Sequence, residues 1–325
     1  MNTGRLRQGS LFIILFLILC LTGCGTVKGI YRKISPEKIY KKVTFQAGKT
    51  DSLKKRVLML PILDQARLGK QKLEKISHTF ISMLSKDERL LIYPARDPIP
   101  TTLKLRNPEF GIVTDPDRAR KAEEMGMNVL LTVIINPLEF RPKKKSFWPL
   151  RVIWPFGGAN REVEISMFVN ALDITNGTLI LSHLEIRKLD LIEDLMAWEE
   201  EDEAELRKSI DEKELQKAFA DMLEGHVEAL REALDRHPWS GRILSVNDGK
   251  VIISAGKDVG IEAGEVFEVY GRGDPVRSAS GRTYYLLGPK IGEVKAEKVM
   301  DSYASAVPLS EGKFQAGYLV RPVKN

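Results

Sequence analysis

The sequence predicts an α/β domain with a mixed sheet and crossover helices, followed by a long helix and a small all-β barrel of the SH3-like type. Between residues 54 and 190, apolar strands alternate with helical patterns and end in a pair of alternating strands. Residues 191–238 join an acidic segment to an amphipathic helix. Residues 239–325 contain many short strands separated by glycine turns, which is typical of a small barrel.

The N-terminal segment has the features of a secretory signal peptide. Arg5 and Arg7 precede an unbroken apolar run over residues 11–21, and the sequence LTGC follows at residues 21–24. This run is too short for a membrane-spanning helix, which needs about 20 apolar residues. We therefore predict that residues 1–23 are a signal peptide that is cleaved before Cys24.

The sequence LTGC resembles the lipobox of bacterial lipoproteins, and this resemblance implies that Cys24 is acylated. Cys20 lies in the apolar run and leaves with the signal, so no thiol remains for a disulfide, a metal site or a nucleophile. By similarity to lipoprotein sorting rules, Gly25 after the cysteine indicates the outer membrane, facing the periplasm. Residues 24–53 are then a lipidated basic tether, either solvated or lying against anionic lipid.

The charge balance argues against a nucleic-acid partner. The whole chain has 50 basic and 44 acidic residues, and removal of residues 1–23 takes away two arginines and no acid. The net charge of the mature chain is therefore about +4, whereas a nucleic-acid-binding protein gathers many cations on one face.

The α/β domain, residues 54–190, begins with an apolar strand at residues 56–64 and a second strand at 91–97. Apolar residues at helical spacing lie between them, which predicts a crossover helix: Leu68, Ile76, Phe80, Ile81 and Leu84. A further helix is expected from Asp115-Pro116 to about Gly126, then one buried strand at residues 128–140. Asn176-Gly177 lies between two alternating runs and predicts a hairpin.

The segment after this domain is strongly acidic, with nine acids and no base in residues 190–205. A long helix follows and stops at His237-Pro238, and one of its faces is apolar: Leu206, Ile210, Phe219, Leu223, Val227, Leu230 and Leu234. This helix either packs on the sheet with a solvated acidic outer face or offers a dedicated acidic binding surface. Calcium is not implied, because no loop has the required ligand spacing.

The C-terminal segment reads as short strands at GRILSV, KVIISAG, KDVGIEAG, EVFEVYG, IGEVKAEKVM, YASAVPL and GYLVRPV. Four glycines are expected in tight turns that need a positive φ: Gly249, Gly256, Gly260 and Gly264. None of them precedes a helix or a Lys-Ser/Thr pair, so they do not form a phosphate-binding loop.

Two family resemblances follow from these segments. Residues 54–190, which end in the strand, turn and strand around LDITNGTLI, resemble the periplasmic domain of curli-secretion (CsgG-like) lipoproteins and TolB-N-like domains. Residues 239–325 resemble the C-terminal domain of the FlgT family of flagellar assembly proteins, on the basis of GRILSVNDGKVIISAGKDVGIEAGEVFEVY, IGEVKAEKVMDSYASAV and FQAGYLVRP. The FlgT resemblance implies a role in building a ring around the flagellar basal body, although the lipobox and the acidic helix depart from that family's pattern.

The sequence contains no local signature of catalysis, so we expect a non-enzyme without cofactor or metal. The four histidines, His78, His183, His226 and His237, are scattered, and surface or capping roles are expected for His78 and His226 in helices and for His237 at a helix end. The nucleophile-elbow, zinc-protease and dinucleotide-binding motifs are all lacking. The tripeptide Arg272-Gly273-Asp274 is interpreted as a turn that enters a loop.

The stretch KKKSFWPLRVIWPFGG, residues 143–158, provides the candidate interaction surface. As a strand it places five apolar side chains on one face: Trp148, Leu150, Val152, Trp154 and Phe156. Pro149 and Pro155 remove donors from one strand edge, which favours a protected edge hairpin over a strand of a closed membrane barrel. The apolar face either packs on its own domain or docks on a partner or membrane.

Together these features predict a non-enzymatic outer-membrane lipoprotein that acts as a periplasmic assembly or scaffold factor for an envelope machine, such as a flagellar basal-body ring or a secretion apparatus. The expected partners are the membrane, through Cys24, and envelope proteins, and a homo-oligomer is compatible with the sequence. The alternatives are a curli-type secretion pore component, a peptidoglycan-synthase activator lipoprotein and an unrecognised hydrolase. A curli-type pore needs two amphipathic hairpins per subunit, and only one is a candidate, the strand at residues 147–156 with the return at residues 161–172.

Overall fold

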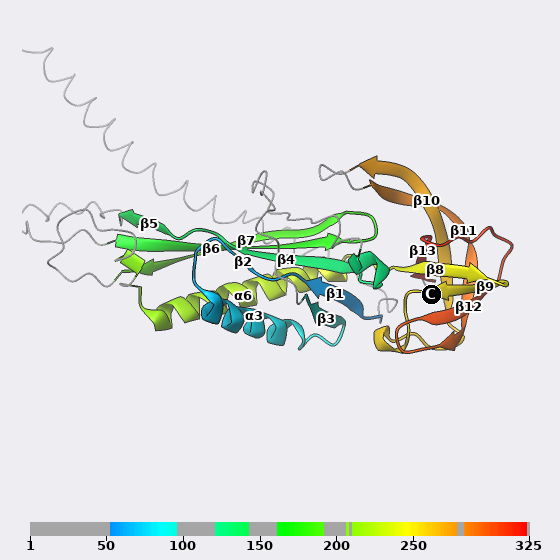
Figure 1. Cartoon of the computed structure of the whole chain (residues 1–325), viewed down its shortest axis with the longest axis horizontal. Coiled ribbons are helices and arrows are strands. Elements are labelled where there is room, and N and C mark those ends of the chain that lie inside the picture. The colour runs from blue at the N-terminus through cyan, green and yellow to red at the C-terminus, as the bar shows by residue number, and fades with distance from the viewer. Residues whose placement is uncertain are drawn as a thin grey trace, which may run out of the picture. The chain divides into compact units, whose positions relative to one another are not determined.

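The computed structural model describes residues 53–95, 121–142, 161–191, 206–207, 210–277 and 283–323 (Figure 1). The chain divides into two compact units, residues 1–48 and 49–325, and all described residues belong to the second. Several predicted features therefore lie outside the described residues: the signal peptide, the lipidation site Cys24, the tether up to residue 52, the start of the helix at Asp115, the acidic stretch 192–205, and the predicted surface Trp148, Leu150, Val152, Trp154 and Phe156.

The first part of the sheet is parallel, as the strand, helix, strand pattern predicts. Strand β1 (Lys55–Met59) pairs in parallel with β3 (Leu90–Pro94), and helix α3 (Lys70–Leu84) makes the crossover between them. Strand β4 (Val129–Ile135) lies parallel to β1 on its other side. All seven residues of β4 are buried, because the strand lies in the centre of the sheet and is covered on both faces.

The second part of the sheet is antiparallel, so the sheet is mixed as predicted. Strands β6 (Arg161–Asp173) and β7 (Leu179–Asp190) form the hairpin at Asn176-Gly177, and β6 also pairs with β4. Gly177 has φ +72°, and its N–H donates to the Asp173 carbonyl at 2.9 Å. The sheet order is β3-β1-β4-β6-β5, with β2 (Leu63–Asp64) on β4 and β7 on β6.

The predicted single strand at residues 128–140 is instead two strands. Strand β4 stops at Ile135, and the chain resumes pairing with β6 in β5 (Glu139–Pro142). Pro137 lies in the gap and has no N–H to continue the ladder. The Asn136 side chain fixes this break by donating to Ser166 Oγ at 2.9 Å.

Helix α6 (Glu212–Asp235) packs on the sheet, which confirms the first of the two interpretations of this helix. Asp211 caps it by accepting hydrogen bonds from the backbone N–H groups of Lys213 and Glu214. Figure 1 shows α3 and α6 along the same face of the sheet. Their buried residues share one core with the strands, and α6 contributes most of the predicted face: Phe219, Leu223, Val227, Leu230 and Leu234. None of the helices in the described part of the chain is both long and apolar enough to span a membrane.

The C-terminal segment forms a closed six-stranded barrel, in the order β10-β11-β12-β9-β8-β13. Its strands are β8 (Gly241–Asn247), β9 (Lys250–Ile253), β10 (Val266–Arg277), β11 (Thr283–Val299), β12 (Ala304–Pro308) and β13 (Leu319–Pro322). Trp239 and Phe267 are the largest fully buried side chains of its core. The predicted strand at KDVGIEAG is wrong: Lys257–Val259 is a 3-10 turn that ends at Gly260 with φ +95°.

Three of the four predicted turn glycines have the expected backbone conformation. Gly249, Gly260 and Gly264 have φ values of +75°, +95° and +98°. The prediction for Gly256 is wrong, because its φ of −139° is ordinary extended backbone. Glycine is required there by close packing instead, since a Cβ atom would lie 2.4 Å from the Met300 carbonyl oxygen.

The interpretation of Arg272-Gly273-Asp274 as a turn is also wrong, because the three residues lie within β10. The pairing of β10 with β11 is shifted between Arg272 and Pro275, which marks a bulge. A Cβ atom on Gly273 would lie 2.9 Å from the Leu286 carbonyl oxygen. The glycine therefore allows the two strands to approach closely at the bulge.

Candidate interaction site between the sheet and the barrel

An ion pair between a buried arginine and a half-buried aspartate joins the α/β part to the barrel. Arg56 lies in β1, and its guanidinium donates to both carboxylate oxygens of Asp258, at 2.9 and 2.7 Å. The same group also donates to the carbonyls of Ser254 and Ser302, each at 2.8 Å. Because Arg56 is only 3% exposed and its hydrogen bonds are well satisfied, the pair holds β1 firmly against the barrel.

Backbone contacts continue this junction on both sides of the ion pair. The Lys54 N–H donates to the Val259 carbonyl at 2.8 Å, and Trp239 Nε1 donates to the Lys54 carbonyl at 3.1 Å. The Asn128 side chain donates to the Ser240 carbonyl at 2.5 Å and accepts from the Arg56 N–H at 2.8 Å. Leu53 enters the core of the barrel. The two parts have separate cores, but Leu53 and these hydrogen bonds join them, so a site formed between them has fixed walls.

The most exposed apolar feature of the barrel is a two-stranded extension, the barrel ribbon, formed by residues 271–277 of β10 and 283–288 of β11. Figure 1 shows these strands extending away from the other strands of the barrel. Strand β13 pairs with β10 only through Tyr270, and β12 pairs with β11 only from Val294 onward. Among the described residues, the outer edges of the ribbon thus have no strand partner. The ribbon exposes Val276, Tyr285, Leu286 and Leu287, which are 47%, 39%, 52% and 45% exposed.

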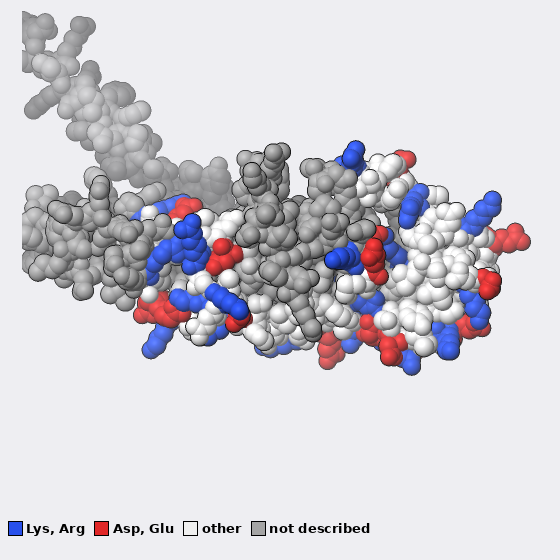
Figure 2. All heavy atoms as spheres, viewed as in Figure 1, with Lys and Arg blue, Asp and Glu red and all other residues white. Residues whose placement is uncertain are grey.

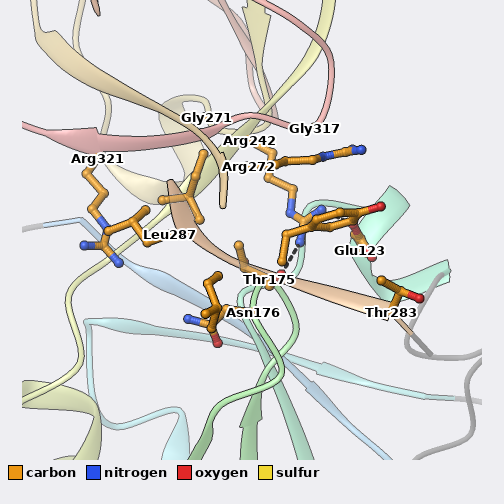
Figure 3. Close-up of a pocket in the computed structure, with 13 residues that line it drawn as sticks. Glu123, Thr175, Asn176, Arg242, Gly271, Arg272, Thr283, Leu287, Gly317 and Arg321 are labelled. Atoms are coloured by element: carbon orange, nitrogen blue, oxygen red, sulfur yellow. Dashed lines mark hydrogen bonds and ion pairs between the residues drawn. The ribbon is translucent and has the colours of Figure 1, made fainter. Parts of the chain in front are cut away.

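A cleft lies where the ribbon meets the β6–β7 turn, and we call it the barrel cleft. Figure 3 shows its walls: the turn contributes Thr175 and Asn176, the ribbon contributes Arg272 and Leu287, and β13 contributes Arg321. Glu123, Arg242, Gly271, Thr283, Tyr285, Leu286, Gly317 and Leu319 complete its lining. The cleft therefore combines three arginines, one acid and an apolar wall.

Only one of the three arginines is neutralised within the cleft. Arg242 is paired with Glu123 and donates to the Thr175 carbonyl at 2.8 Å, as Figure 3 shows. The Arg272 guanidinium lies 4.8 Å from the centre of the Tyr285 ring. Arg321 lies on the opposite side of Leu287 from Arg242 and Arg272, and its guanidinium is 5.8 Å from the centre of the Tyr270 ring. Among the described residues, neither Arg272 nor Arg321 forms an ion pair.

The acid nearest to Arg321 along the paired strands is already occupied. Glu268 lies opposite Arg321 in the β10–β13 register and accepts hydrogen bonds from the Tyr270 hydroxyl at 2.6 Å and from Lys290 at 2.9 Å. These two donors, and to a smaller extent the charges of Lys290 and Arg321, lower the pKa of Glu268 below its usual value. The Arg321 Nε atom is buried and has no hydrogen-bond acceptor. The cleft differs in this respect from the barrel surface that faces the viewer in Figure 2, where basic and acidic side chains are interspersed.

The structure brings together two histidines that are far apart in the sequence. His183 on β7 and His226 on α6 have their Nδ1 atoms 3.0 Å apart. His226 is fully buried, which corrects the expectation of a surface or capping role, and His237 Nε2 lies at hydrogen-bond distance, 2.7 Å, from Asp173 Oδ2. No group of three potential metal ligands occurs among the described residues. No sequence signal could reveal the His183–His226 contact, because it depends on the packing of α6 beneath β7.

A second hollow lies between α3 and α6, over the buried side chains of Ile76 and Phe219. Lys72 Nζ lies 2.5 Å from Glu212 Oε2 and closes one side of it. The hydrogen bond from Lys72 lowers the pKa of Glu212 below its usual value. Unlike the barrel cleft, this hollow has a floor that is already packed in the core of the sheet.

None of the residues of the barrel cleft was predicted from the sequence as part of a site. The predicted surface from Trp148 to Phe156 and the lipidation site Cys24 lie outside the described residues, so they stay predictions. Arg272 was noted only for its tripeptide, and Arg321 stands in the ordinary strand sequence LVRP. The four consecutive apolar residues YYLL, at residues 284–287, were the one feature of the sequence that could have indicated the exposed ribbon.

Comparison with known proteins does not identify a family. No family model and no curated protein matches the sequence. Similar solved structures include lipoprotein GNA1162 from Neisseria meningitidis, with 11% identity over 53% of this chain and 99% of that chain at a TM-score of 0.26. The PelC dodecamer from Paraburkholderia phytofirmans has 12% identity over 42% and 71% of the two chains at a TM-score of 0.24. TolB from Acinetobacter baumannii has 9% identity over 86% and 62% at a TM-score of 0.26. These similarities are too low to assign a fold family or a function.

Proposed function

We propose that this chain is a non-enzymatic outer-membrane lipoprotein that acts as a periplasmic assembly or scaffold factor for an envelope machine. In this proposal Cys24 is acylated and anchors the protein, while the sheet and barrel together present a binding surface to other envelope proteins. The signal sequence and the LTGC motif support the location. The junction at Arg56 and Asp258 supports the idea of a rigid body that can hold a partner in a defined position.

The observation that carries the proposal is the barrel ribbon. Exposed apolar side chains on a two-stranded extension with open edges are costly in water and are typical of surfaces that bind other proteins. Val276 and Leu286 are both about half exposed, and Tyr285 and Leu287 line the adjacent cleft. An extension of this kind adds nothing to the core of its own barrel, so binding to a partner is the best explanation of its apolar composition.

The proposal is tested by cross-linking in the native envelope, followed by identification of the captured proteins. The informative variant replaces both Leu286 and Leu287 with serine. The matched control replaces Leu309 with serine, because Leu309 is 51% exposed but lies outside the ribbon. We expect the parent protein and the control to capture the same envelope proteins, and we expect the ribbon variant to lose them without loss of thermal stability.

Three results would contradict the proposal. If only lipid is recovered with the parent protein, the scaffold function is wrong. If the ribbon variant and the Leu309 control capture the same partners equally well, the binding surface lies elsewhere. If the purified protein forms reproducible channels in planar bilayers, a secretion pore of the curli type replaces the scaffold. An effect of the pure protein on the rate of a peptidoglycan synthase would identify the partner as that enzyme and refine the proposal.

A further inference from the structure

We infer that the barrel cleft binds an extended acidic segment of a partner protein, which pairs with the open edge of β10 and places carboxylates at Arg272 and Arg321. This inference rests on the proposed function, because it specifies the chemistry of the protein that the scaffold would hold. It is drawn from three properties of the cleft: an open strand edge, two guanidinium groups without acid partners among the described residues, and an apolar wall between them.

The first property is the strand edge. Strand β13 occupies the edge of β10 opposite Phe267, Glu268, Val269 and Tyr270, and its first residue, Leu319, is the partner of Tyr270. Gly317, which has φ +85°, turns the preceding chain away, so the edge of β10 from residue 271 to 277 is left without a strand among the described residues. An extended segment can continue the sheet at this position with backbone hydrogen bonds, as in other complexes formed by strand addition. Pro275 lacks an N–H and limits this pairing to part of the edge.

The second property is the charge of the cleft. Arg242 has Glu123 and the Thr175 carbonyl, so the only acid of the lining is already in use. Among the described residues Arg272 and Arg321 form no ion pair, the Glu268 carboxylate near Arg321 is hydrogen-bonded to Tyr270 and Lys290, and the buried Nε of Arg321 is a donor that has no acceptor. A buried donor without an acceptor is unfavourable. A carboxylate matches the planar guanidinium with two hydrogen bonds, so an acidic side chain is the ligand group that best satisfies these arginines.

The third property separates a peptide from a simple anion or a lipid headgroup. Figure 3 shows Arg321 and the Arg242 side of the cleft on opposite sides of Leu287, and the Arg272 guanidinium lies against Tyr285 rather than against Arg321. Arg272 and Arg321 thus lie on different sides of the apolar wall at Leu287. A strand with acidic residues separated by apolar ones can reach both and can cover Tyr285 and Leu287 between them.

The inference is tested by fluorescence polarisation with the full-length chain in neutral detergent. The probe is a labelled heptapeptide that alternates glutamate and valine, and the matched peptide alternates glutamine and valine. We expect the glutamate peptide to bind and the glutamine peptide to bind at least about tenfold more weakly, since charged hydrogen bonds are stronger than neutral ones. Raising the salt concentration is expected to weaken binding of the glutamate peptide.

Protein variants locate the site. We expect Arg272→Gln and Arg321→Gln each to weaken binding of the glutamate peptide by about tenfold. Arg277→Gln is the matched control, because Arg277 is an exposed arginine of the same ribbon that does not line the cleft. Arg321→Lys is expected to recover only part of the binding, since lysine keeps the charge but not the planar pair of donors. Thermal unfolding of each variant shows whether the barrel is intact.

The inference is overturned if the glutamine peptide binds as tightly as the glutamate peptide, or if Arg277→Gln weakens binding as much as the two cleft variants. It is also overturned if the chain with Cys24 replaced by serine binds phosphatidylglycerol vesicles through Arg272 and Arg321 but binds neither peptide. If ribbon-dependent cross-linked partners are found while the glutamate peptide does not bind, the scaffold function stands and the acidic partner is wrong.

Discussion

His183 Nδ1 and His226 Nδ1 lie 3.0 Å apart across the contact between β7 and α6, and the two rings meet edge to face with their centres 4.9 Å apart. One nitrogen must donate and the other accept, so the contact requires at least one neutral imidazole. His226 is fully buried and its Nε2 atom has no hydrogen-bond partner. The carboxylate of the neighbouring Glu185 is already paired with Arg187 at 2.6 Å. A protonated His226 would therefore find no free acid beside it to balance its positive charge.

Stability is therefore expected to fall in mild acid. Burial, and then the neighbouring His183, lower the pKa of His226 to about 3 from its ordinary value of 6.5. Between these two values the unfolded chain binds a proton that the folded chain does not, so the free energy of unfolding decreases as the pH falls from 6.5 toward 3. The contribution of this one group is at most about 1.4 kcal/mol per pH unit. Urea unfolding at pH 7.5 and pH 5 measures it.

The matched variants for this prediction are His226→Leu and His78→Gln. The first removes the buried imidazole and is expected to flatten the dependence of stability on pH. The second replaces an exposed histidine of α3 and is expected to leave that dependence unchanged. An unchanged pH dependence in His226→Leu would show that the acid sensitivity arises from other groups.

Loss of the Arg56–Asp258 pair is expected to destabilise the chain strongly. Arg56→Met leaves the carboxylate of Asp258 and the carbonyls of Ser254 and Ser302 without their donor. Breaking a fully buried pair costs about 3–5 kcal/mol, and because the Asp258 side chain is 25% exposed we expect a cost of about 3 kcal/mol. The control is Lys250→Met, which removes the exposed pair of Lys250 with Glu297 and should cost less than about 1 kcal/mol. Chemical unfolding compares the two, and equal costs would mean that the junction at Arg56 does not contribute to folding.

Two glycines of the barrel separate the effects of packing and of backbone conformation. Gly249→Ala places a Cβ in open space at φ +75° and is expected to cost about 1–2 kcal/mol from the backbone alone. Gly256→Ala has no such backbone cost, but its Cβ would meet the carbonyl oxygens of Met300 and Asp301 at 2.4 and 2.6 Å. We expect the larger loss of thermal stability for Gly256→Ala, because the contacting atoms are backbone that cannot move aside cheaply. A smaller loss at Gly256 than at Gly249 would contradict this packing.

Local patterns were sufficient to predict much of the fold. The helical spacing from Leu68 to Leu84 and the alternation around Asn176-Gly177 depend on neighbours in the sequence, and both elements form as predicted. The C-terminal segment forms a barrel as predicted, although its segment KDVGIEAG is not a strand. Predictions were wrong where a distant contact decides the outcome. Gly256 is fixed by Met300, and Gly273 by Leu286, so their roles appear only when the barrel is closed.

The candidate site could not be predicted for the same reason. The barrel cleft takes residues from the helix that ends near Gly126, the β6–β7 turn, β8, the ribbon and β13, and these are separated by up to about 200 residues of the chain. The arginines become a site only through their positions around Leu287 and through the absence of acids for Arg272 and Arg321 in the described lining. In the sequence, Asp274 stands two residues from Arg272, while Arg242 and Arg321 stand alone among apolar residues, so nothing along the chain marks the three as a group.

The cap of α6 gives the last prediction. The carboxylate of Asp211 accepts hydrogen bonds from the N–H groups of Lys213 and Glu214, at 2.7 and 3.1 Å, and its negative charge lies at the positive end of the helix. Asp211→Ala is expected to lower the free energy of unfolding by about 1 kcal/mol. Asp221→Ala is the control, because Asp221 is exposed in the interior of the same helix and has no capping role. Since alanine favours helix interiors, the control should be neutral or slightly stabilising, and a loss in Asp221→Ala equal to that in Asp211→Ala would show that negative charge, not capping, explains the effect.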